Sequence, residues 1–497
     1  MSNRPETNKQ SCPVYKKCGG CQLQNLSYPE QLEFKQRKVE KLLKRFCTVE
    51  KIIGMKTPYH YRNKVQAAFY TDKKGKIISG VYQSGSHHVV GIDSCQTEDV
   101  IADKIIVAVR KLLPSFRMTT YNEDTGKGFL RHILVKRGFA TNQIMLVLVT
   151  GTPVFPSKNN FVKAILKQFP EITTIVQNIN PYRTNLVLGD NQKVLYGKGY
   201  IEDILCGCRF RISPKSFYQI NPVQTEVLYG KAIEFANLKS NETVLDTYCG
   251  IGTIGIIAAK NGAGNVIGAE LNGDAVRDAI VNARANNLKN IRFYKADAGE
   301  FMREAADEDE KPDVVFMDPP RAGSDRKFLD SLIKMSPKKV VYVSCNPETL
   351  ARDLAYLTQN SPYKAQKIQP VDMFPHTAHV ETVVLLSHKK PDGHINVKVE
   401  FGEGEGKVPL DNIAKRAEEY KPKERVTYKM IKEYIEAKYS FKVHTAYIAE
   451  VKRDLGLPMY DAPNAVEELK QPRKHPTAEK VEAIKDALRY FEIMEEI

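Results

Sequence analysis

The sequence predicts an α/β fold whose largest domain is a doubly wound parallel sheet. From residue 243 onward, short apolar stretches alternate with amphipathic helical stretches, which is typical of β-strands joined by crossover helices. The first of these strands runs into the glycine-rich segment GIGTIG, and the second ends at Glu270, about 20 residues further on. Because an acidic residue at this spacing takes both hydroxyls of a ribose, the pattern predicts a nucleotide-type site at the carboxyl edge of the sheet.

Composition restricts the class of protein. The chain has 497 residues, enough for two to four domains, and a net charge of +15. That excess predicts a polyanionic partner, most often nucleic acid, although a merely soluble basic surface is the alternative. No apolar run reaches the ~18 residues of a membrane span, and the start MSNRPETNKQ lacks the apolar core of a signal peptide. We therefore expect a cytoplasmic protein with no membrane partner.

An amino-terminal cysteine cluster predicts a metal site. CPVYKKCGGC places Cys12, Cys18 and Cys21 close together, and Cys95 in GIDSCQTEDV is the best candidate for a fourth thiolate. Four thiolates hold either an iron–sulfur cluster or zinc. Zinc sites usually contain two C-x2-C knuckles and this segment contains one, so the spacing favours iron–sulfur over zinc or unligated cysteines.

The middle of the chain predicts an α+β domain over 51–210. KVQAAFY and IISGVYQ form a hairpin, LRHILVKRG and NQIMLVLVTGT form a second pair of strands, and FVKAILKQFP forms a short amphipathic helix. Four side chains on or beside these strands are candidates for phosphate contacts, each with a solvated surface charge as the alternative: Arg62, Arg131, His132 and Arg137.

Cys345 lies at the predicted junction of a strand and a helix. In VVYVSCNPETLARDL the apolar run reads as a buried strand, Asn346 suits a helix N-cap, and Pro347 suits the first turn. The cysteine would then lie at the ligand-binding edge of the sheet, where a helix N-terminus favours a thiolate. A small buried residue that fills the corner is the alternative.

Two features favour S-adenosylmethionine (SAM) over a nicotinamide cofactor. The first is DPPR, from Asp318 to Arg321, a stiff turn typical of enzymes that present a planar base to SAM. The second is Cys345, because hydride transfer needs no thiol, whereas methylation of a pyrimidine at carbon 5 needs a nucleophile at carbon 6 and a separate base. Glu381 in DMFPHTAHVETVVLLS is the candidate base, with His376 and His379 as rivals.

Taken together, the motifs resemble the RNA uracil-5-methyltransferases of the TrmA/RumA type over roughly residues 12–390. The resemblance depends on CPVYKKCGGC, SFYQINPVQTE, LDTYCGIGTIG, DPPRAG, SCNPETLARDL and DMFPHTAHVE, which stand in the family's order. It implies a Rossmann-like methyltransferase domain that forms 5-methyluridine, with Cys345 as nucleophile and Glu381 as base. The implied SAM contacts are Gln219, Tyr248, Thr253, Glu270, Asp297 and Asp318, and the implied ligands of a 4Fe–4S cluster are Cys12, Cys18, Cys21 and Cys95.

The cluster makes the chain most similar to the 23S ribosomal RNA (RlmD/RlmCD) branch. We expect a monomer that acts on 23S ribosomal RNA, naked or in a pre-ribosomal particle. A tRNA uracil-5-methyltransferase is the nearest alternative, and a non-catalytic RNA-binding iron–sulfur protein is the alternative from another class. Many family members begin with a small oligonucleotide-binding barrel, which we do not expect here because eleven residues precede Cys12.

The expected organisation has four parts: an iron–sulfur region (1–50 and 83–100), a central RNA-binding domain (51–210), the SAM-dependent domain (211–392) and a mainly helical extension (393–497). In the extension, TYKMIKEYIEAKYS and TAYIAEVKRDLGL have the spacing of a helix-turn-helix. They predict either an RNA-binding module or a small helical cap.

Overall fold

The structure is a computed structural model of the chain that forms two compact units, residues 1–395 and 396–497. It describes residues 12–83, 86, 88–184, 186–308, 311–388, 428–455 and 475–490. The segment KKPDGHINVKVEFGEGEGKVPLDN, residues 389–412, whose glycine-rich and charged sequence predicts a connection to the extension, lies outside these residues.

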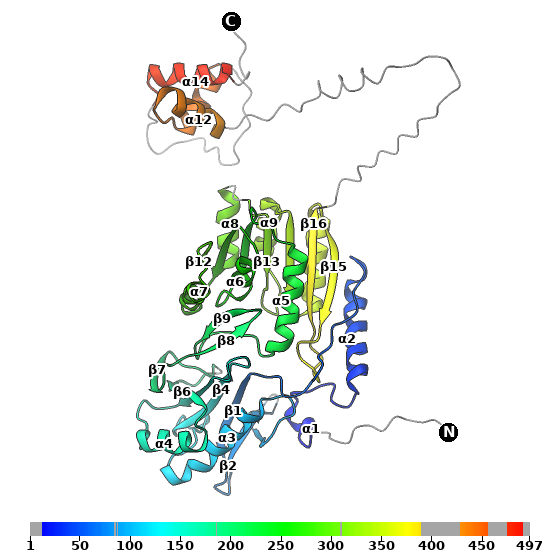
Figure 1. Ribbon diagram of the computed structural model, residues 1–497, viewed down its shortest axis with the longest axis vertical. Coiled ribbons are helices and arrows are strands. Elements are labelled where there is room, and N and C mark those ends of the chain that lie inside the picture. Colours follow the sequence, from blue (N-terminus) through cyan, green and yellow to red (C-terminus); the bar gives the residue numbers. More distant parts are fainter. Residues whose placement is uncertain are drawn as a thin grey trace, which may run out of the picture. The chain divides into compact units, whose positions relative to one another are not determined.

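A seven-stranded sheet in the order β12-β11-β10-β13-β14-β16-β15 forms the larger part of the first unit (Figure 1). The first five strands in this order are parallel, whereas β16 is antiparallel to both β14 and β15. The parallel part confirms the predicted doubly wound fold. The strands are β10 (Thr243–Thr247), β11 (Asn265–Glu270), β12 (Ile291–Lys295), β13 (Val314–Met317), β14 (Lys339–Ser344), β15 (Tyr363–Val371) and β16 (Glu381–His388).

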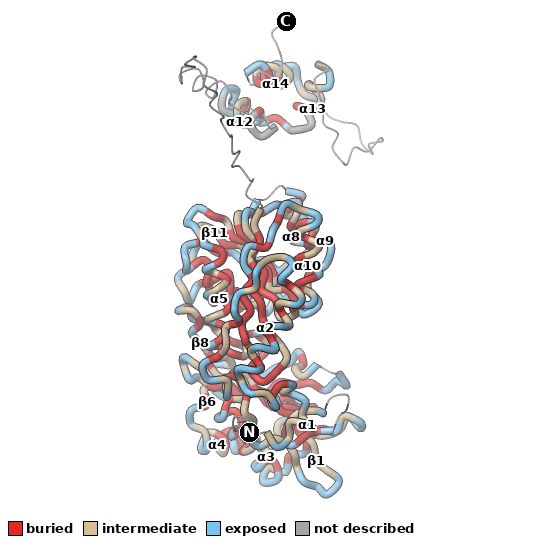
Figure 2. The backbone as a smooth tube through the Cα atoms, turned by 90° about the vertical axis from the view of Figure 1, so that its right-hand side faces the viewer, coloured by how far each residue is buried: buried red, intermediate tan, exposed pale blue. Residues whose placement is uncertain are grey.

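Helices cover both faces of this sheet because alternate residues of each strand point to opposite sides. Val314 and Phe316 of β13 join one buried cluster, and Val315 and Met317 join another. Figure 2 shows the buried positions as red stretches of the tube between the helices. The first cluster includes α5 (Pro222–Ala236), α6 (Thr253–Lys260) and α7 (Gly273–Ala285), and the second includes α8 (Ala298–Asp307), α9 (Arg326–Met335) and α10 (Pro347–Asn360).

A second seven-stranded sheet, in the order β3-β2-β1-β4-β5-β6-β7, forms the central region. It contains the predicted hairpin and strand pair, and α3 (Val100–Leu112) and α4 (Lys158–Gln168) pack on one face. The strands are β1 (Lys64–Thr71), β2 (Ile77–Tyr82), β3 (Val89–Gly91), β4 (Leu130–Arg137), β5 (Ile144–Thr150), β6 (Ile172–Ile179) and β7 (Asn191–Tyr196). A hairpin of β8 (Ile201–Leu205) and β9 (Cys208–Ile212) contacts α5, α6 and α7.

The amino-terminal segment packs against the parallel sheet rather than forming a separate layer. After the short α1 (Tyr15–Cys18), α2 (Tyr28–Leu43) begins with a capping box in which Ser27 and Glu30 satisfy each other's backbone N–H groups. Its buried residues Val39 and Leu43 join the cluster of α8, α9 and α10, and the helix contacts α10 and β15. This helix therefore connects the cysteine segment to the half of the unit that contains the parallel sheet.

The second unit contains α12 (Tyr428–Tyr439), α13 (Thr445–Asp454) and α14 (Ala478–Tyr490) around a small apolar core of their own. In the described part of the chain, no helix is both long and apolar enough to cross a membrane.

Candidate active site

A glycine-rich turn joins β10 to α6 at the carboxyl edge of the parallel sheet. Tyr248, Gly250 and Gly252 all have positive φ angles, of 62°, 57° and 81°. A Cβ atom on Gly252 would lie 2.7 Å from the ring of Phe293, so that position needs glycine for space as well as for conformation. The predicted glycine-rich turn is present, and its close approach to a nucleotide stays a prediction.

The side chain of Glu270 bridges two loops at this edge. Its Oε2 accepts a hydrogen bond from the Gly250 N–H at 3.0 Å, and its Oε1 accepts one from the Asn272 N–H at 2.7 Å. The carboxylate is therefore fixed at the end of β11, where a ribose would be bound.

Two carboxyl groups lie near the turn, that of Asp246, which is buried, and that of Asp318, which is half-buried. Burial, with the nearby charges of Asp318 and Glu270, raises the pKa of Asp246 to about 8, although the Gly255 N–H that donates to its Oδ2 lowers it. Burial raises the pKa of Asp318 to about 7. Asp246 Oδ1 is buried without a hydrogen-bond partner. An unpaired buried acceptor at a glycine-rich turn fits a polar ligand such as SAM.

The remaining predicted cofactor residues surround this edge. Gln219 and Thr253 both hydrogen-bond the buried hydroxyl of Tyr229, a residue that the sequence analysis missed because nothing distinguishes it from other aromatic residues of α5. The Tyr248 ring packs against Phe328 with centroids 5.5 Å apart. Asp297 caps α8 by accepting from the N–H groups of Gly299 and Glu300 at 2.9 and 3.1 Å.

Cys345 lies at the predicted corner, between the end of β14 and the start of α10. Asn346 is the N-cap, and its Oδ1 accepts from the Glu348 N–H at 3.1 Å. The cysteine lines a cavity of about 180 Å³ together with Lys38, Arg321, Asn346, Pro347, Glu348, His379 and Val380. A ligand in this cavity would meet the sulfur directly.

Cys345, Asp318 and Glu381 lie within electrostatic reach of one another. Burial raises the pKa of Cys345 to about 11, with contributions from Glu381 and Asp318, while Arg321 lowers it. Burial, followed by the charge of Asp318, raises the pKa of Glu381 to about 8, and Arg321 opposes this shift. Both groups are therefore neutral at pH 7 before a substrate binds.

The structure separates the two histidines that rivalled Glu381. His376 is 3% exposed and contributes to the scaffold. Its backbone N–H donates to Gln31 Oε1 at 2.8 Å, and its ring Nε2 lies 2.9 Å from the Pro58 carbonyl oxygen. His379 lines the Cys345 cavity, and burial followed by the charge of Arg321 lowers its pKa.

A buried polar network holds the loop before Glu381 against α2. Lys35 and Asp372 form an ion pair at 2.5 Å in which both side chains are 0% exposed. Lys35 also donates to the Phe374 carbonyl oxygen at 3.0 Å, and the Tyr28 hydroxyl donates to Asp372 at 2.9 Å. On the same helix, Lys38 pairs with Glu348 at 3.1 Å. Helix α2 therefore contacts the loops that carry both candidate catalytic residues.

The four predicted cluster ligands are half-buried and unpaired as disulfides. Burial and then Cys95 raise the pKa of Cys21 to about 12, and Cys18 and Cys12 add smaller effects, so the four thiols lie within electrostatic range. Within the described residues, however, no three His, Cys, Asp or Glu side chains are gathered closely enough to hold a metal ion. The donor chemistry fits an iron–sulfur cluster, whereas the assembled ligand geometry is not present.

Two of the four predicted phosphate contacts in the central domain are corrected. Arg131 is 2% exposed and its guanidinium is bound by Glu123 and by the carbonyl oxygens of Asn180 and Tyr182. His132 is buried as well, so neither side chain is available to RNA. Arg137, which pairs with Asp99 at 2.6 Å, and Arg62 are half-buried, and their contact with a phosphate stays a prediction.

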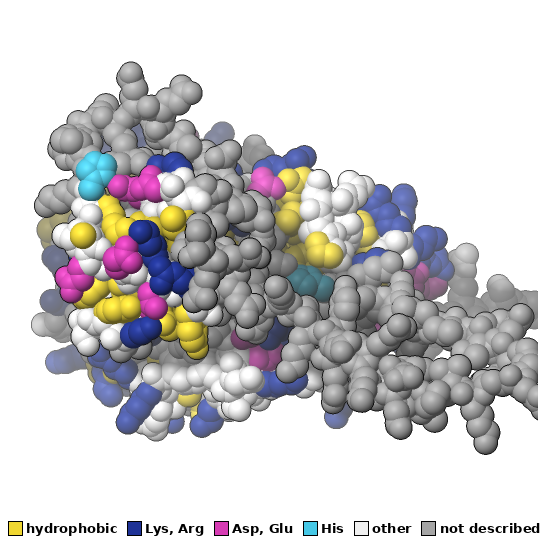
Figure 3. All heavy atoms as spheres, turned by 90° about the horizontal axis from the view of Figure 1, so that it is seen from above, with side chains coloured by type: hydrophobic (Ala, Val, Ile, Leu, Met, Phe, Trp, Pro, Cys, Tyr) yellow, Lys and Arg dark blue, Asp and Glu magenta, His cyan; other side chains and the backbone are white. Residues whose placement is uncertain are grey.

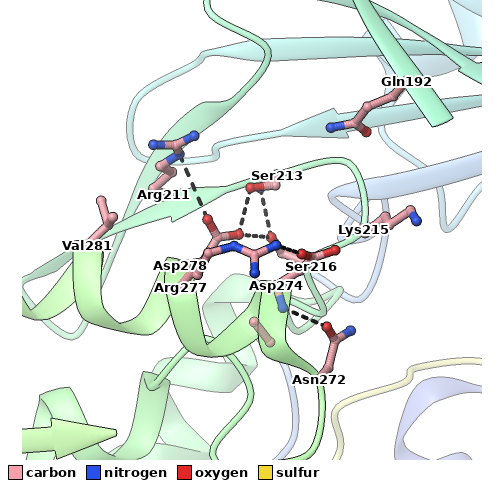
Figure 4. A pocket seen from close by; sticks show the side chains of 11 residues that line it. Gln192, Arg211, Ser213, Lys215, Ser216, Asn272, Asp274, Arg277, Asp278 and Val281 are labelled. Carbon is pink, nitrogen blue, oxygen red and sulfur yellow. Dashed lines mark hydrogen bonds and ion pairs between the residues drawn. The ribbon is translucent and has the colours of Figure 1, made fainter. Parts of the chain in front are cut away.

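A larger cavity of about 340 Å³ lies between β9, the 213–216 loop and α7 (Figure 4). Its basic side chains are compensated: Arg211 lies 3.9 Å from Asp278, Lys215 pairs with Asp190 at 3.3 Å, and Arg277 pairs with Asp274. The hydroxyl groups of Ser213 and Ser216 both donate to Asp278, at 2.6 and 2.7 Å. These contacts fix the loop that leads to Gln219.

Comparison with known proteins identifies close relatives. Residues 183–389 match the family "tRNA (Uracil-5-)-methyltransferase". An uncharacterized RNA methyltransferase of Bacillus cereus is 44% identical over 388 residues, which cover 77% of this chain and 84% of that protein. One from Listeria monocytogenes is 46% identical over 379 residues, which cover 76% and 83%.

One solved structure is similar over most of the chain. The Pyrococcus abyssi tRNA (uracil-54, C5)-methyltransferase in complex with S-adenosyl-L-homocysteine has a TM-score of 0.63 and 32% identity. The similarity covers 74% of this chain and 85% of that one.

Proposed function

The chain belongs to the RNA (uracil-5-)-methyltransferase family, and from that membership we propose that it forms 5-methyluridine in 23S ribosomal RNA by nucleophilic catalysis from Cys345. The observation that carries the proposal is the proximity of the half-buried Cys345 thiol to the carboxyl groups of Glu381 and Asp318, close enough for each to affect the pKa of the cysteine. A thiol nucleophile with a carboxyl base nearby is what methylation of an unactivated pyrimidine carbon requires.

The first step is addition of the Cys345 sulfur to carbon 6 of uracil. The Cys345 thiol gives its proton to solvent, the thiolate forms the S–C6 bond, and the electrons of the C5–C6 double bond move into an enolate that makes carbon 5 nucleophilic. Arg321 opposes the rise in the pKa of Cys345, so its positive charge favours the thiolate and the developing enolate.

The cofactor is SAM, which supplies an electrophilic methyl group when it is bound. The chain's own residues would hold it at the carboxyl edge of the sheet: Glu270 at the ribose, the turn from Tyr248 to Thr253 around the adenosine, and Asp318, Gln219 and Asp297 around it.

Glu381 then removes the proton from carbon 5. Proton removal restores the C5–C6 double bond, the S–C6 bond breaks, and the Cys345 thiol is re-formed. Glu381 is 4% exposed, so once ionised it is a stronger base than a solvated carboxylate.

Two variants test this mechanism on RNA transcripts read by mass spectrometry. Cys345→Ala should form neither 5-methyluridine nor a covalent RNA adduct. Glu381→Gln should lower kcat by about 10²–10⁴ and accumulate a covalent RNA–protein adduct, because the sulfur cannot leave until carbon 5 loses its proton. His379→Gln is the matched control from the same cavity, and an adduct in that variant instead would assign the base to His379.

The cysteine set supports 23S ribosomal RNA as the substrate through its resemblance to the ribosomal branch. The tRNA alternative is supported by the Pyrococcus abyssi structure, whose protein acts on uracil 54 of tRNA. Methylation of 23S ribosomal RNA fragments and tRNA transcripts in parallel separates the two. Turnover on tRNA alone would overturn the ribosomal assignment and leave the chemistry intact.

We also propose that Cys12, Cys18, Cys21 and Cys95 hold a 4Fe–4S cluster that shapes the amino-terminal segment. Methyl transfer moves no net electrons, so a structural role fits the reaction better than a redox role. Anaerobically purified protein should contain iron and acid-labile sulfide in equal amounts, and Cys21→Ser should lose both. Zinc in place of iron in the native protein would contradict the proposal.

A further inference from the structure

A separate cavity of about 260 Å³ lies on the central sheet and shares no lining residue with the Cys345 cavity. Aromatic side chains make up much of its lining: Tyr70 at the end of β1, Tyr82 at the end of β2, and Tyr121 from the segment before β4. Tyr70 and Tyr82 are half-buried, so part of each ring is accessible. Flat aromatic walls on a sheet are suited to stack an unpaired nucleobase.

Tyr121 gives the cavity a rigid wall. Its side chain is almost fully buried, with 4% of the residue exposed. The ring is fixed, because the Arg131 guanidinium stacks 4.3 Å from its centroid. A fixed ring keeps the shape of the cavity without a ligand.

The charge at the rim disfavours a phosphate. Among the described residues that line the cavity there is no Lys or Arg, whereas there are two acidic residues, Glu123 and Asp124, beside one histidine, His88. Arg131 binds both oxygens of Glu123. The carboxylate of Asp124, which is exposed, can therefore accept hydrogen bonds from a ligand.

The neighbouring residue Asn122 adds a donor. Its Oδ1 accepts hydrogen bonds from the backbone N–H groups of Asp124 and Thr125 at 2.9 and 2.8 Å. The amide nitrogen therefore points away from these two N–H groups and can donate to a ligand. Together the rim offers an amide donor beside a carboxylate acceptor. Guanine has the complementary edge, because its O6 acceptor is adjacent to the N1–H and N2–H donors, whereas adenine and uracil each present one donor there.

We propose that this cavity binds an unstacked guanine of the RNA substrate, with Tyr82 and Tyr70 against the base and Asp124 on its N1–H and N2–H groups. The proposal rests on the proposed function, which supplies an RNA as substrate. It adds a site that recognises sequence or structure away from the methylated uridine. Such a site would contribute to binding of the RNA and not to the chemical step.

The absence of tryptophan from the sequence allows a direct test. Tyr82→Trp keeps an aromatic wall and places the protein's single tryptophan in the cavity. Its fluorescence should be quenched by a uridine hexanucleotide that contains one guanine. The apparent affinity measured from this quenching should be about tenfold lower when inosine, adenine or uridine replaces the guanine. Asp124→Asn in this background should remove the preference for guanine over inosine. Tyr196→Trp, on β7 of the same sheet, is the matched control and should show no base-dependent quenching.

Equal quenching by all four hexanucleotides, or the same response from Tyr196→Trp, would overturn the proposal. Methylation of full-length RNA by the native protein is measured in parallel. Methylation without guanine-dependent quenching refutes the guanine site alone, and guanine-dependent quenching without methylation of any RNA refutes the proposed function alone.

Discussion

Cys345 and Glu381 share one buried acidic environment, and each is held in its neutral form. The pKa of Cys345 is raised to about 11 and that of Glu381 to about 8, in both cases mainly by burial. The resting site therefore carries neither thiolate nor base at pH 7. A substrate that brings hydrogen bonds and excludes water has to shift both equilibria before reaction occurs.

The first prediction concerns the pH dependence of turnover. In the proposed mechanism Glu381 takes the carbon 5 proton only when ionised, and its raised pKa keeps most of it protonated below about pH 8. We expect kcat/KM to increase as the pH rises from 6 to about 8.5, because more of the free enzyme then carries the base. The rate on a short RNA, measured at constant ionic strength, checks this. A profile that is flat or falls over this range would contradict the assignment.

The second prediction concerns Asp246 and the free energy of unfolding. Its pKa is raised from 3.8 to about 8 in the folded state, so the folded protein keeps a proton that the unfolded chain loses between about pH 4 and 8. Stability therefore decreases as the pH rises through this range. Asp246→Asn keeps an acceptor for the Gly255 N–H and does not titrate. We expect the variant to gain about 1–3 kcal/mol relative to the native chain on going from pH 5 to pH 8.

Urea denaturation without SAM, at both pH values, measures this difference. A gain that is the same at pH 5 and pH 8 would mean that the carboxyl group is not responsible.

At the scale of elements, α2 connects the cysteine segment to both catalytic loops. Lys35 is the central contact, because it is fully buried and bonds both Asp372 and the Phe374 carbonyl oxygen. Lys35→Met should lower the free energy of unfolding by about 3–5 kcal/mol, since it leaves the buried charge of Asp372 unpaired. It should also lower kcat, because the loop before Glu381 loses its anchor.

Arg37→Met is the matched control two residues away on the same helix. Arg37 pairs with Glu33 at the surface, where the side chains are 74% and 59% exposed. Its loss should change stability by no more than about 0.5 kcal/mol. Equal effects of the two substitutions would contradict the anchoring role.

The turn between β10 and α6 gives a further prediction at this scale. Gly252→Ala puts a Cβ atom against Phe293 at a φ of 81°, so it should lower stability by about 1–3 kcal/mol and weaken SAM binding. Gly230→Ala, in α5, meets nothing within 4 Å and should raise stability by up to about 1 kcal/mol. Thermal unfolding and calorimetric titration with SAM measure both effects. Unchanged SAM affinity in Gly252→Ala would show that the turn does not contact the cofactor.

Local patterns predicted most strands of both sheets and the strand–helix corner at Cys345, because periodicity and capping are encoded within a few residues. The strands β3, β7 and β15 were not predicted. Helix α2 was missed although Ser27, Pro29 and Glu30 carry a capping-box signal that the sequence analysis did not use. The burial of Arg131 and His132 was not predictable, because it depends on strand pairing. The Lys35–Asp372 pair joins residues 337 positions apart, and no local pattern predicts such a contact.

At the scale of the whole molecule, the positive charge is unevenly distributed along the sequence. Residues 400–497 contain 18 Lys and Arg against 20 Asp and Glu, a net charge of −2. The whole chain has a net charge of +15, so residues 1–399 have a net charge of +17. The face shown in Figure 3 has basic side chains interspersed with acidic and hydrophobic ones. Attraction for a polyanion therefore resides in residues 1–399.

The last prediction follows from this distribution. The affinity of a protein for RNA falls with salt in proportion to the number of phosphates that its cations neutralise. Deletion of residues 400–497 removes as many basic side chains as acidic ones, to within two charges. We expect the truncated chain to bind RNA with an unchanged slope of log K against log salt, measured by filter binding between 50 and about 200 mM salt. The control is a charge reversal within residues 1–399, Lys73→Glu with Lys74→Glu, in the exposed turn of the β1–β2 hairpin. It tests whether basic side chains of this part determine the slope of log K against log salt. Lys136 is not suitable for such a reversal because it is buried. A slope that becomes smaller on truncation would show that the extension binds RNA. Its helices would then have to place their basic side chains on one face, although the sequence of the extension is nearly neutral.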